Sequence, residues 1–300
     1  MKHFNQSLNC KICNQVGFKI YSKSFEDEQL KFFFTNYYGQ DKYDNFKKNL
    51  EGNIYELLKC NKCKFLWQKY SPSQEFSLEL YENIIDKDES LEKSRLNFSK
   101  RKKSNFKEIK KIIRNSVEKK LNFLDFGAGW GHWLISGKGL PFQPYAFELS
   151  PSKKNFLSSN DIEVLDFDKI HLFENFFHYI RLDQVLEHVD NPNEVLQFIK
   201  KLAKKNCIFF VAVPDGKHLI ESEKIVSIKK GPIQPLEHLN CFSKSSLKKI
   251  LILNGFQPLN LKELFIMNLK DFNFDLVSFK SLLLDIRNYF FSTSIKFRIK

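Results

Sequence analysis

The stretch Leu124-Asp125-Phe126-Gly127-Ala128-Gly129-Trp130-Gly131 decides the fold of this sequence. It follows an apolar, strand-like NFLDF and opens a helical HWLISG, so a glycine loop joins a strand to a helix. The chain has only 11 Gly, and five of them lie between residues 127 and 139. Glycine lets the backbone turn tightly and approach a ligand closely, and the helix that follows points unpaired N–H groups at it. The loop therefore predicts a ligand site at the end of a strand, with a tight turn that binds nothing as the alternative.

Short apolar runs extend this pattern on the C-terminal side of the loop. They are separated by helical stretches and lie at residues 143–149, 161–167, 176–185 and 207–214. Strands that alternate with helices predict an α/β chain with a Rossmann-like, doubly wound, mostly parallel sheet. The second strand ends in Glu148, where a carboxylate in such folds accepts both hydroxyls of a ribose. A further helix is expected at 243–255, ended by Gly255, and a further strand at 257–266.

Three motifs, D-F-G-A-G-W-G, F-E-L-S-P and D-Q-V-L-E-H-V-D-N-P, resemble those of the class I S-adenosylmethionine-dependent methyltransferases over roughly residues 121–256. The resemblance implies S-adenosylmethionine as cofactor, with its methionine part on the glycine loop, its ribose on Glu148 and its adenine near Asp166 or Asp168. The cofactor-binding residues that it implies are Asp125, Phe126, Gly127, Gly129, Trp130, Gly131, Glu148, Asp166 and Gln184. A nicotinamide-binding Rossmann protein is the competing interpretation, but in its G-x-G-x-x-G motif the third Gly comes one residue later.

Two C-x-x-C pairs lie near the N-terminus, at Cys10/Cys13 and Cys60/Cys63. Each pair presents two thiolates, and together they predict a closed structural zinc site, with a redox pair or coincidence as the alternatives. The aromatic stretch at 31–49 between them is expected to be a loop or hairpin insertion. Cys207 and Cys241 are expected to be buried.

The sequence after the second pair, F-L-W-Q-K-Y-S-P-S followed by L-Y-E, is similar to that of zinc-ribbon methyltransferases that include sugar C-methyltransferases. The resemblance implies a nucleotide-linked keto-deoxysugar as substrate. In those enzymes a Glu-His pair acts with a Tyr three residues before the His. The matching pair here is Glu237-His238, but position 235 is Pro.

Catalytic residues are expected in two Glu-His pairs, because a His with a pKa near 7 suits proton removal from a carbon next to a keto group. The candidates are His238, Glu237 and His188, with structural histidines as the alternative. Some oxygen methyltransferases hold a divalent metal with an E-x-x-E-H pattern. Gln184 replaces the first Glu of that pattern, so we do not expect a metal there.

The net charge of +13 is concentrated in one segment. Between Lys93 and Lys120 there are twelve Lys or Arg and two Glu, a balance of 12 − 2 = +10, which leaves 13 − 10 = +3 for the remaining residues. This segment is expected to be a helix with a solvated basic face, or a platform for the phosphates of a nucleotide-linked substrate or for an anionic membrane. Only six of the 48 basic residues are Arg, which does not favour phosphate readout on a nucleic acid.

The sequence thus predicts a zinc-ribbon module at 1–75, a basic helical connector at 76–120, a methyltransferase domain at 121–270 and a C-terminal extension at 271–300. The predicted function is S-adenosylmethionine-dependent methylation, at carbon or oxygen, of a small molecule such as a sugar or nucleotide-sugar. An RNA methyltransferase that uses the ribbon and the basic helix, and a non-catalytic scaffold with a degenerate pocket, are the alternatives. No charge-free run approaches the roughly 18 residues of a membrane span, and the start of the sequence has no apolar leader, so a cytoplasmic location is expected.

Overall fold

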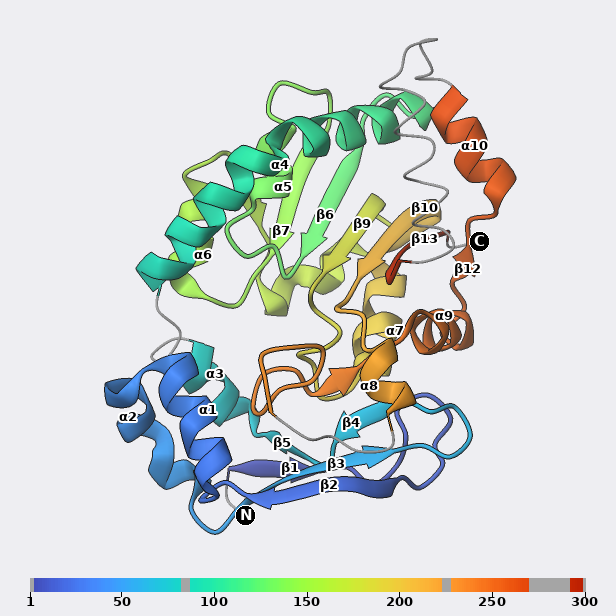
Figure 1. The fold of residues 1–300 in the computed structure, drawn as a ribbon. Coiled ribbons are helices and arrows are strands. Elements are labelled where there is room, and N and C mark those ends of the chain that lie inside the picture. The colour runs from blue at the N-terminus through green and yellow to red at the C-terminus, as the bar shows by residue number, and fades with distance from the viewer. Residues whose placement is uncertain (1–2, 82–86, 223–227, 270–291, 299–300) are drawn as a thin grey trace. The chain divides into compact units, whose positions relative to one another are not determined.

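A computed structural model describes residues 3–81, 87–222, 228–269 and 292–298. The chain divides into two compact units (Figure 1). Unit 1 comprises Met1–Asp86, Leu186–Val195 and Val213–Ile250, and unit 2 comprises Lys87–Val185, Leu196–Ala212 and Leu251–Lys300. The boundaries predicted from the sequence follow one another along the chain, whereas these units are interleaved.

Unit 2 is built on a seven-stranded sheet in the order β12-β13-β10-β9-β6-β7-β8. Its strands are β6 (Asn122–Phe126), β7 (Gln143–Phe147), β8 (Glu163–Val164), β9 (Phe177–Asp183), β10 (Ala203–Ala212), β12 (Gln257–Pro258) and β13 (Ser294–Arg298). The five strands from β8 to β10 are parallel, and β13 and β12 add to one edge in antiparallel orientation. The chain order reverses beside β6, so the predicted doubly wound, mostly parallel sheet is confirmed.

Three helices pack on one face of this sheet: α4 (Lys87–Asn115), α5 (His132–Ser136) and α6 (Pro151–Ser158) (Figure 1). Their shared core includes Ile109 of α4, Trp133 of α5 and Tyr179 of β9, all nearly inaccessible to solvent. The remaining helices that follow the strands are the 3-10 helix η2 (Phe167–Phe173), α7 (Pro192–Leu202), α9 (Lys244–Leu253) and α10 (Leu261–Leu269). The predicted burial of Cys207, in β10, is confirmed.

Unit 1 contains a small antiparallel sheet in the order β11-β4-β3-β2 and a separate pair, β1 with β5. These strands are β1 (Phe4–Gln6), β2 (Phe18–Ser24), β3 (Ile54–Lys59), β4 (Leu66–Gln68), β5 (Tyr70–Pro72) and β11 (Asn240–Cys241). The unit also holds α1 (Glu28–Tyr38), α2 (Gln40–Leu50), α3 (Gln74–Glu79) and α8 (Lys217–Glu221). An aromatic core joins the helices to the sheet, and Cys241 is buried in it as predicted.

The aromatic stretch expected to be a loop or hairpin forms the two helices α1 and α2, so that expectation was wrong. Its large apolar residues recur three to four apart and lie on one buried face of each helix, namely Leu30, Phe33, Phe34 and Tyr38, then Tyr43, Phe46 and Leu50. Asp27 caps α1 by accepting the N–H of Gln29 at 2.9 Å. Gly39, at φ 91°, separates the two helices where a side chain would be strained.

The strand expected at 257–266 is also wrong beyond its first two residues. After β12 the chain turns into α10, because Asn260 and Glu263 form a reciprocal capping box in which each side chain accepts the other's backbone N–H at 2.9 Å. The C-terminal extension predicted at 271–300 contains β13, and residues 271–291 of it lie outside the described residues.

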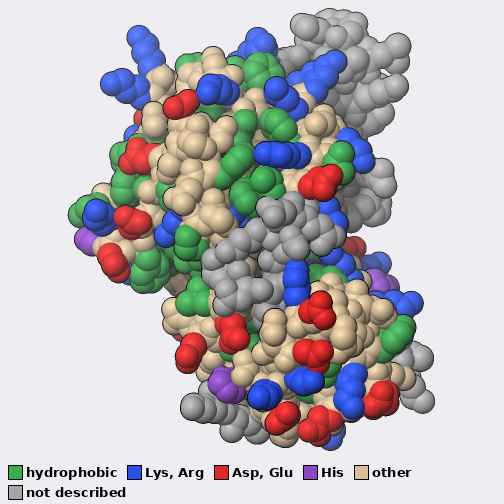
Figure 2. All heavy atoms as spheres, turned by 90° about the vertical axis from the view of Figure 1, so that its left-hand side faces the viewer, with side chains coloured by type: hydrophobic (Ala, Val, Ile, Leu, Met, Phe, Trp, Pro, Cys, Tyr) green, Lys and Arg blue, Asp and Glu red, His purple; other side chains and the backbone are tan. Residues whose placement is uncertain are grey.

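The basic segment forms most of α4, whose inner side packs in the core of unit 2. On the face of the molecule in Figure 2, Lys and Arg side chains are interspersed with Asp, Glu and apolar side chains. Among the described residues, no helix combines the length and apolar character needed to cross a membrane.

Candidate functional site

The glycine loop follows β6 in unit 2, and all three of its alternating glycines have left-handed backbone angles. Gly127, Gly129 and Gly131 have φ of 74°, 56° and 62°. A Cβ at Gly127 would lie 2.6 Å from a Val185 methyl group, and one at Gly131 would lie 2.2 Å from a Leu157 methyl group. A Cβ at Gly129 would meet nothing within 4 Å. The loop is therefore packed closely at both ends and open in the middle, which fits a backbone cradle for a ligand.

Glu148 lies directly after β7 and is bonded to this loop. Its Oε2 accepts the N–H of Gly129 at 2.8 Å, and its Oε1 accepts the N–H groups of Leu149 and Ser150 at 2.9 and 3.0 Å. The parallel register of β6 and β7 brings their carboxyl ends to the same edge of the sheet. A half-buried carboxylate is thus held beside the open part of the loop, as a ribose contact requires.

Asp125, which the resemblance implies for cofactor binding, forms an ion pair within the sheet. Its side chain is buried in β6, and Arg181 of β9 lies beside it with Nη1 at 3.3 Å from Oδ1. The other guanidinium nitrogen of Arg181 contacts the carboxylate of Asp183. Burial raises the pKa of Asp125 to about 6, although the guanidinium opposes the rise. Arg181 is a site residue that the sequence reasoning missed.

The other residues implied for the cofactor lie around the same edge with different exposures. Gln184 is exposed after β9, at φ 59°, and its N–H donates to the Ala212 carbonyl. Asp166 and Asp168 are both exposed at the start of η2, so the geometry leaves the choice between them open.

Two aromatic residues of the predicted cofactor set pack tightly in unit 2. Phe126 is buried and stacks on Phe147 with ring centroids 4.6 Å apart. Trp130 is nearly buried, and its Nε1–H donates to Ser90 at 3.2 Å.

The three candidate catalytic residues come together in unit 1. The imidazole rings of His188 and His238 are 4.6 Å apart and nearly perpendicular. Nδ1 of His188 donates to the carbonyl of Glu237 at 3.0 Å, and Nδ1 of His238 donates to the carbonyl of Gly231. A proton on Nδ1 leaves Nε2 of each ring as a lone-pair acceptor, which suits a base or a metal ligand.

Two tyrosines that the sequence reasoning did not single out complete this cluster. The Tyr38 hydroxyl donates to Oε1 of Glu237 at 2.6 Å, and the Tyr81 hydroxyl lies 2.9 Å from Nδ1 of His188. Burial raises the pKa of Glu237 and lowers that of His238. The Glu187 carboxylate and the two histidines also have ligand atoms within 4.8 Å of one another, a set that could hold a divalent cation.

The four knuckle cysteines of unit 1 converge as a tetrahedral metal site requires. The sulfur atoms of Cys10 and Cys63 are 3.3 Å apart, as are those of Cys13 and Cys60, and all four lie within 4.8 Å of one another. Four sulfurs bound to one zinc at about 2.3 Å lie roughly 3.8 Å apart. In both knuckles a backbone N–H donates to the first cysteine's sulfur, at 3.4 Å in one and 3.5 Å in the other. The set fits a zinc ion.

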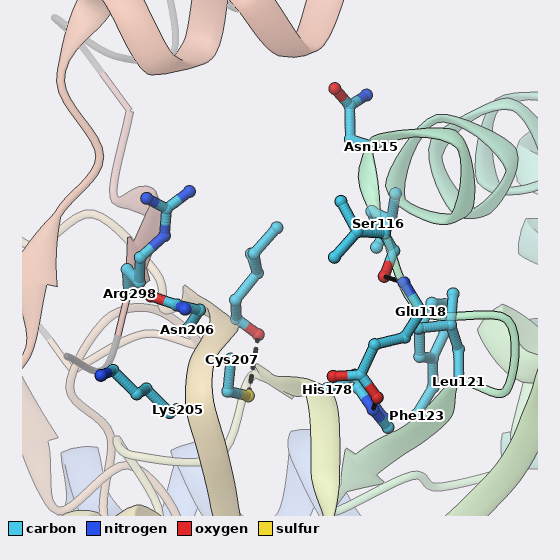
Figure 3. A pocket seen from close by; sticks show the side chains of 13 residues that line it. Asn115, Ser116, Glu118, Leu121, Phe123, His178, Lys205, Asn206, Cys207 and Arg298 are labelled. Carbon is cyan, nitrogen blue, oxygen red and sulfur yellow. Dashed lines mark hydrogen bonds and ion pairs between the residues drawn. The ribbon is translucent and has the colours of Figure 1, made fainter.

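A pocket of about 190 Å³ lies in unit 2 where β6 and β9 begin (Figure 3). Two of its charged side chains are engaged. Arg298 donates to Glu263, and the Glu118 carboxylate accepts from Lys204 and lies 2.7 Å from His178. It lies at the opposite edge of the sheet from the glycine loop, and none of the predicted site residues lines it.

Comparisons with known proteins agree with the architecture. Residues 96–261, more than half of the chain, match a family model described as a methyltransferase domain. Among solved structures, the [4+2]-cyclase SpnF is 15% identical, covering 65% of this chain and 81% of that one, with a TM-score of 0.43. A SAM-dependent methyltransferase from Aquifex aeolicus is 18% identical, covering 52% and 81%, with a TM-score of 0.39.

A SAM-dependent methyltransferase of Thermotoga maritima, titled a possible histamine N-methyltransferase, is 15% identical, covering 57% of this chain and 78% of that one, with a TM-score of 0.40. A comparison with curated proteins gave no match. The predicted fold and the predicted enzyme class, an S-adenosylmethionine-dependent methyltransferase, are confirmed by the family match. The chain belongs to the family of methyltransferase domains.

Proposed function

We propose that the protein transfers a methyl group from S-adenosylmethionine to a small molecule, a sugar or nucleotide-linked sugar, at carbon or oxygen. The observation that carries the proposal is the pairing of His188 and His238 with both Nδ1 atoms bound to backbone carbonyls. Two adjacent imidazole rings, each with Nδ1 at a backbone carbonyl, are suited to take a proton from an acceptor hydroxyl or from a carbon next to a keto group.

The cofactor residues of unit 2 support the donor half of this proposal. The open backbone at Gly129 accommodates the methionine part, and Glu148 accepts the ribose hydroxyls. When bound, S-adenosylmethionine supplies a sulfonium-activated methyl group with a good leaving group. The residues of the loop then hold and orient the cofactor for an in-line displacement, which is the main contribution that a protein makes to this chemistry.

The acceptor half is assigned to His238 as base, with His188 and Glu237 in support. Burial, together with the charge of Lys230, lowers the pKa of His238 although the Gly231 carbonyl opposes the change, which favours the neutral ring that can accept a proton. We also propose that Cys10, Cys13, Cys60 and Cys63 hold a structural zinc ion. Four thiolates leave no open position on the metal, so the ion stabilises unit 1 and takes no part in methyl transfer.

The test is a screen of nucleotide-sugars with S-adenosylmethionine, read by mass spectrometry for the gain of one methyl group. His238→Ala is expected to abolish turnover while the calorimetric affinity for S-adenosylmethionine is unchanged. The control is His218→Ala, because His218 is an exposed histidine of the same unit, in α8. Unchanged turnover in His238→Ala would assign this histidine to structure.

A further inference from the structure

Tyr38, the last residue of α1, is bonded to the candidate acceptor site from 199 residues away in the sequence. Its hydroxyl donates to Oε1 of Glu237 at 2.6 Å, and the two residues are only 9% and 7% exposed. A hydrogen bond to a carboxylate inside a protein is stronger than one in water, since solvent does not compete for either partner. This contact therefore fixes the Glu237 side chain.

The aromatic core of unit 1 holds Tyr38 in place. Its ring lies 5.4 Å from that of Phe46 in an edge-to-face arrangement and 6.2 Å from that of Phe34 in a stacked one. The ring of Tyr37 lies 4.7 Å away, and Nζ of Lys230 lies 5.1 Å from the Tyr37 ring centroid. Since these rings come from both α1 and α2, the Tyr38 hydroxyl has little freedom to move.

The backbone of Glu237 connects its side chain to both histidines. Its carbonyl accepts Nδ1–H of His188 at 3.0 Å, and His238 is the next residue in the chain. The preceding residue, Leu236, has a left-handed φ of 70°, which a leucine avoids in the absence of other constraints. The Glu237 side chain is thus one anchor of a loop in an unfavourable conformation.

The same loop has a second anchor on the sheet of unit 1. Nε2 of Gln68, in β4, donates to the carbonyls of Gln234 and His238 at 2.6 and 2.9 Å. This anchor holds the backbone around the loop but does not touch the Glu237 side chain. Tyr37 also hydrogen-bonds the Glu237 side chain. Loss of the Tyr38 hydroxyl would therefore remove one of two side-chain bonds to Glu237 without unfolding the loop.

We propose that Tyr38 is a positioning residue of the acceptor site: by holding Glu237 it sets the orientation of His188 and His238. The proposal rests on the proposed function of these two histidines in methyl transfer. It gives the helix pair α1–α2, inserted between the two cysteine knuckles, a role in the chemistry. The titratable and charged groups that act on Glu237 are Tyr38 and Tyr37 from α1 and Lys230 from its own loop.

The test compares Tyr38→Phe, which removes one hydroxyl and keeps the ring, with Tyr43→Phe. Tyr43 is buried in the same core, and no hydrogen bond of its hydroxyl occurs among the described residues. Nitrogen-15 NMR titration of the two site histidines, assigned with His188→Ala and His238→Ala, is the first readout. Tyr38→Phe is expected to shift the pKa or tautomer ratio of His188 or His238, and Tyr43→Phe to leave both unchanged.

Turnover is the second readout, once an acceptor is known. Removing a hydrogen bond from a carboxylate lowers kcat for methyl transfer by about 10-fold to 100-fold in Tyr38→Phe. The affinity for S-adenosylmethionine is expected to stay that of the wild type. Because the hydroxyl holds the Glu237 pKa down, its loss is expected to move the pH–rate profile, whereas Tyr43→Phe leaves the profile in place.

Two results separate failure of this inference from failure of the proposed function. Histidine titrations and pH profiles that are the same in both tyrosine variants would overturn the role of Tyr38. Shifted histidine titrations together with full turnover in His238→Ala would support the positioning by Tyr38 and overturn the catalytic role of the cluster.

Discussion

Arg181→Met is expected to destabilise unit 2 strongly, because it leaves a buried carboxylate without its cation. Arg181 lies in β9 opposite Asp125 of β6 on one side and Phe210 of β10 on the other. The side chains of Arg181 and Asp125 are 16% and 3% exposed. Removing one partner of a buried ion pair costs about 3–5 kcal/mol, a large part of the roughly 5–15 kcal/mol that stabilises a typical domain.

The loss of stability in Arg181→Met is expected to depend on pH, and the pKa of Asp125 determines its direction. The pKa of Asp125 is about 6 in the folded protein, above its ordinary value, and rises further without the guanidinium. The folded state then binds a proton that the unfolded state releases, so stability falls as pH rises from about 4 through the folded pKa. The deficit of Arg181→Met should therefore be largest near pH 8 and smaller near pH 5, where Asp125 is protonated in the folded variant.

Urea unfolding of wild type and variant at pH 5 and pH 8 measures both effects. Arg298→Met is the control, since Arg298 and Glu263 form a pair about one third exposed, worth about 1 kcal/mol or less. Adding Asp125→Asn to Arg181→Met should recover much of the loss at pH 8. A deficit at pH 8 below about 1 kcal/mol that does not change with pH would refute the argument.

Glu148→Ala is expected to weaken S-adenosylmethionine binding about 10-fold to 100-fold by calorimetry, because it removes the proposed ribose acceptor and a bond to the glycine loop. Unchanged affinity would contradict this. Gly131→Ala and Gly139→Ala both strain a left-handed backbone, but only at Gly131 would the Cβ lie 2.2 Å from a leucine side chain. In urea unfolding, Gly131→Ala should lower the free energy of unfolding by about 1–3 kcal/mol more than Gly139→Ala does. Equal losses in the two variants would argue against close packing of the loop. Cys60→Ser is expected to reduce zinc from one per chain to none and to lower Tm, whereas Cys207→Ser keeps the metal; wild-type protein purified without zinc would contradict the site.

The fold of unit 2 could be predicted because its signals are local. The apolar runs and the glycine loop are continuous in sequence, and the strands lie where those runs occur. The helix expected over 76–120 was predicted less well. The described part of it includes α3 and α4. Val117 lies beyond the end of α4 and is 95% exposed, whereas Ile112, within α4, is buried. Local periodicity does not show where a long helix ends without a strong cap.

The set of chain segments that make up unit 1 could not be predicted in the same way. Residues 186–195 and 213–250 leave the sheet of unit 2 and fold with the N-terminal segment. Such interleaving depends on contacts between distant segments, for example Asn240, whose Nδ2 donates to the carbonyls of Leu186 and Val189. The local sequence pattern of neither segment predicts these hydrogen bonds.

The candidate site shows the same limit on prediction. Glu148 could be singled out because it follows a strand at a known distance from the glycine loop, and its role there stays a prediction. Arg181 had a signal that could have been used, since an arginine inside the apolar run FFHYIRLDQV must be paired when the strand is buried. Tyr38 had no such signal, because its partner Glu237 is 199 residues away.

Pro235 shows why a departure from a motif does not by itself remove a chemical group from a site. The resemblance to sugar C-methyltransferases implies a tyrosine at this position, and its absence alone would argue against methylation at carbon. The structure instead brings a phenol to Glu237 from α1. A phenol delivered by a separate helix can act only while the aromatic core of unit 1 is intact. The proposed positioning of the histidines is therefore tied to the folding of an insertion, α1–α2, whose sequence favoured a loop or hairpin.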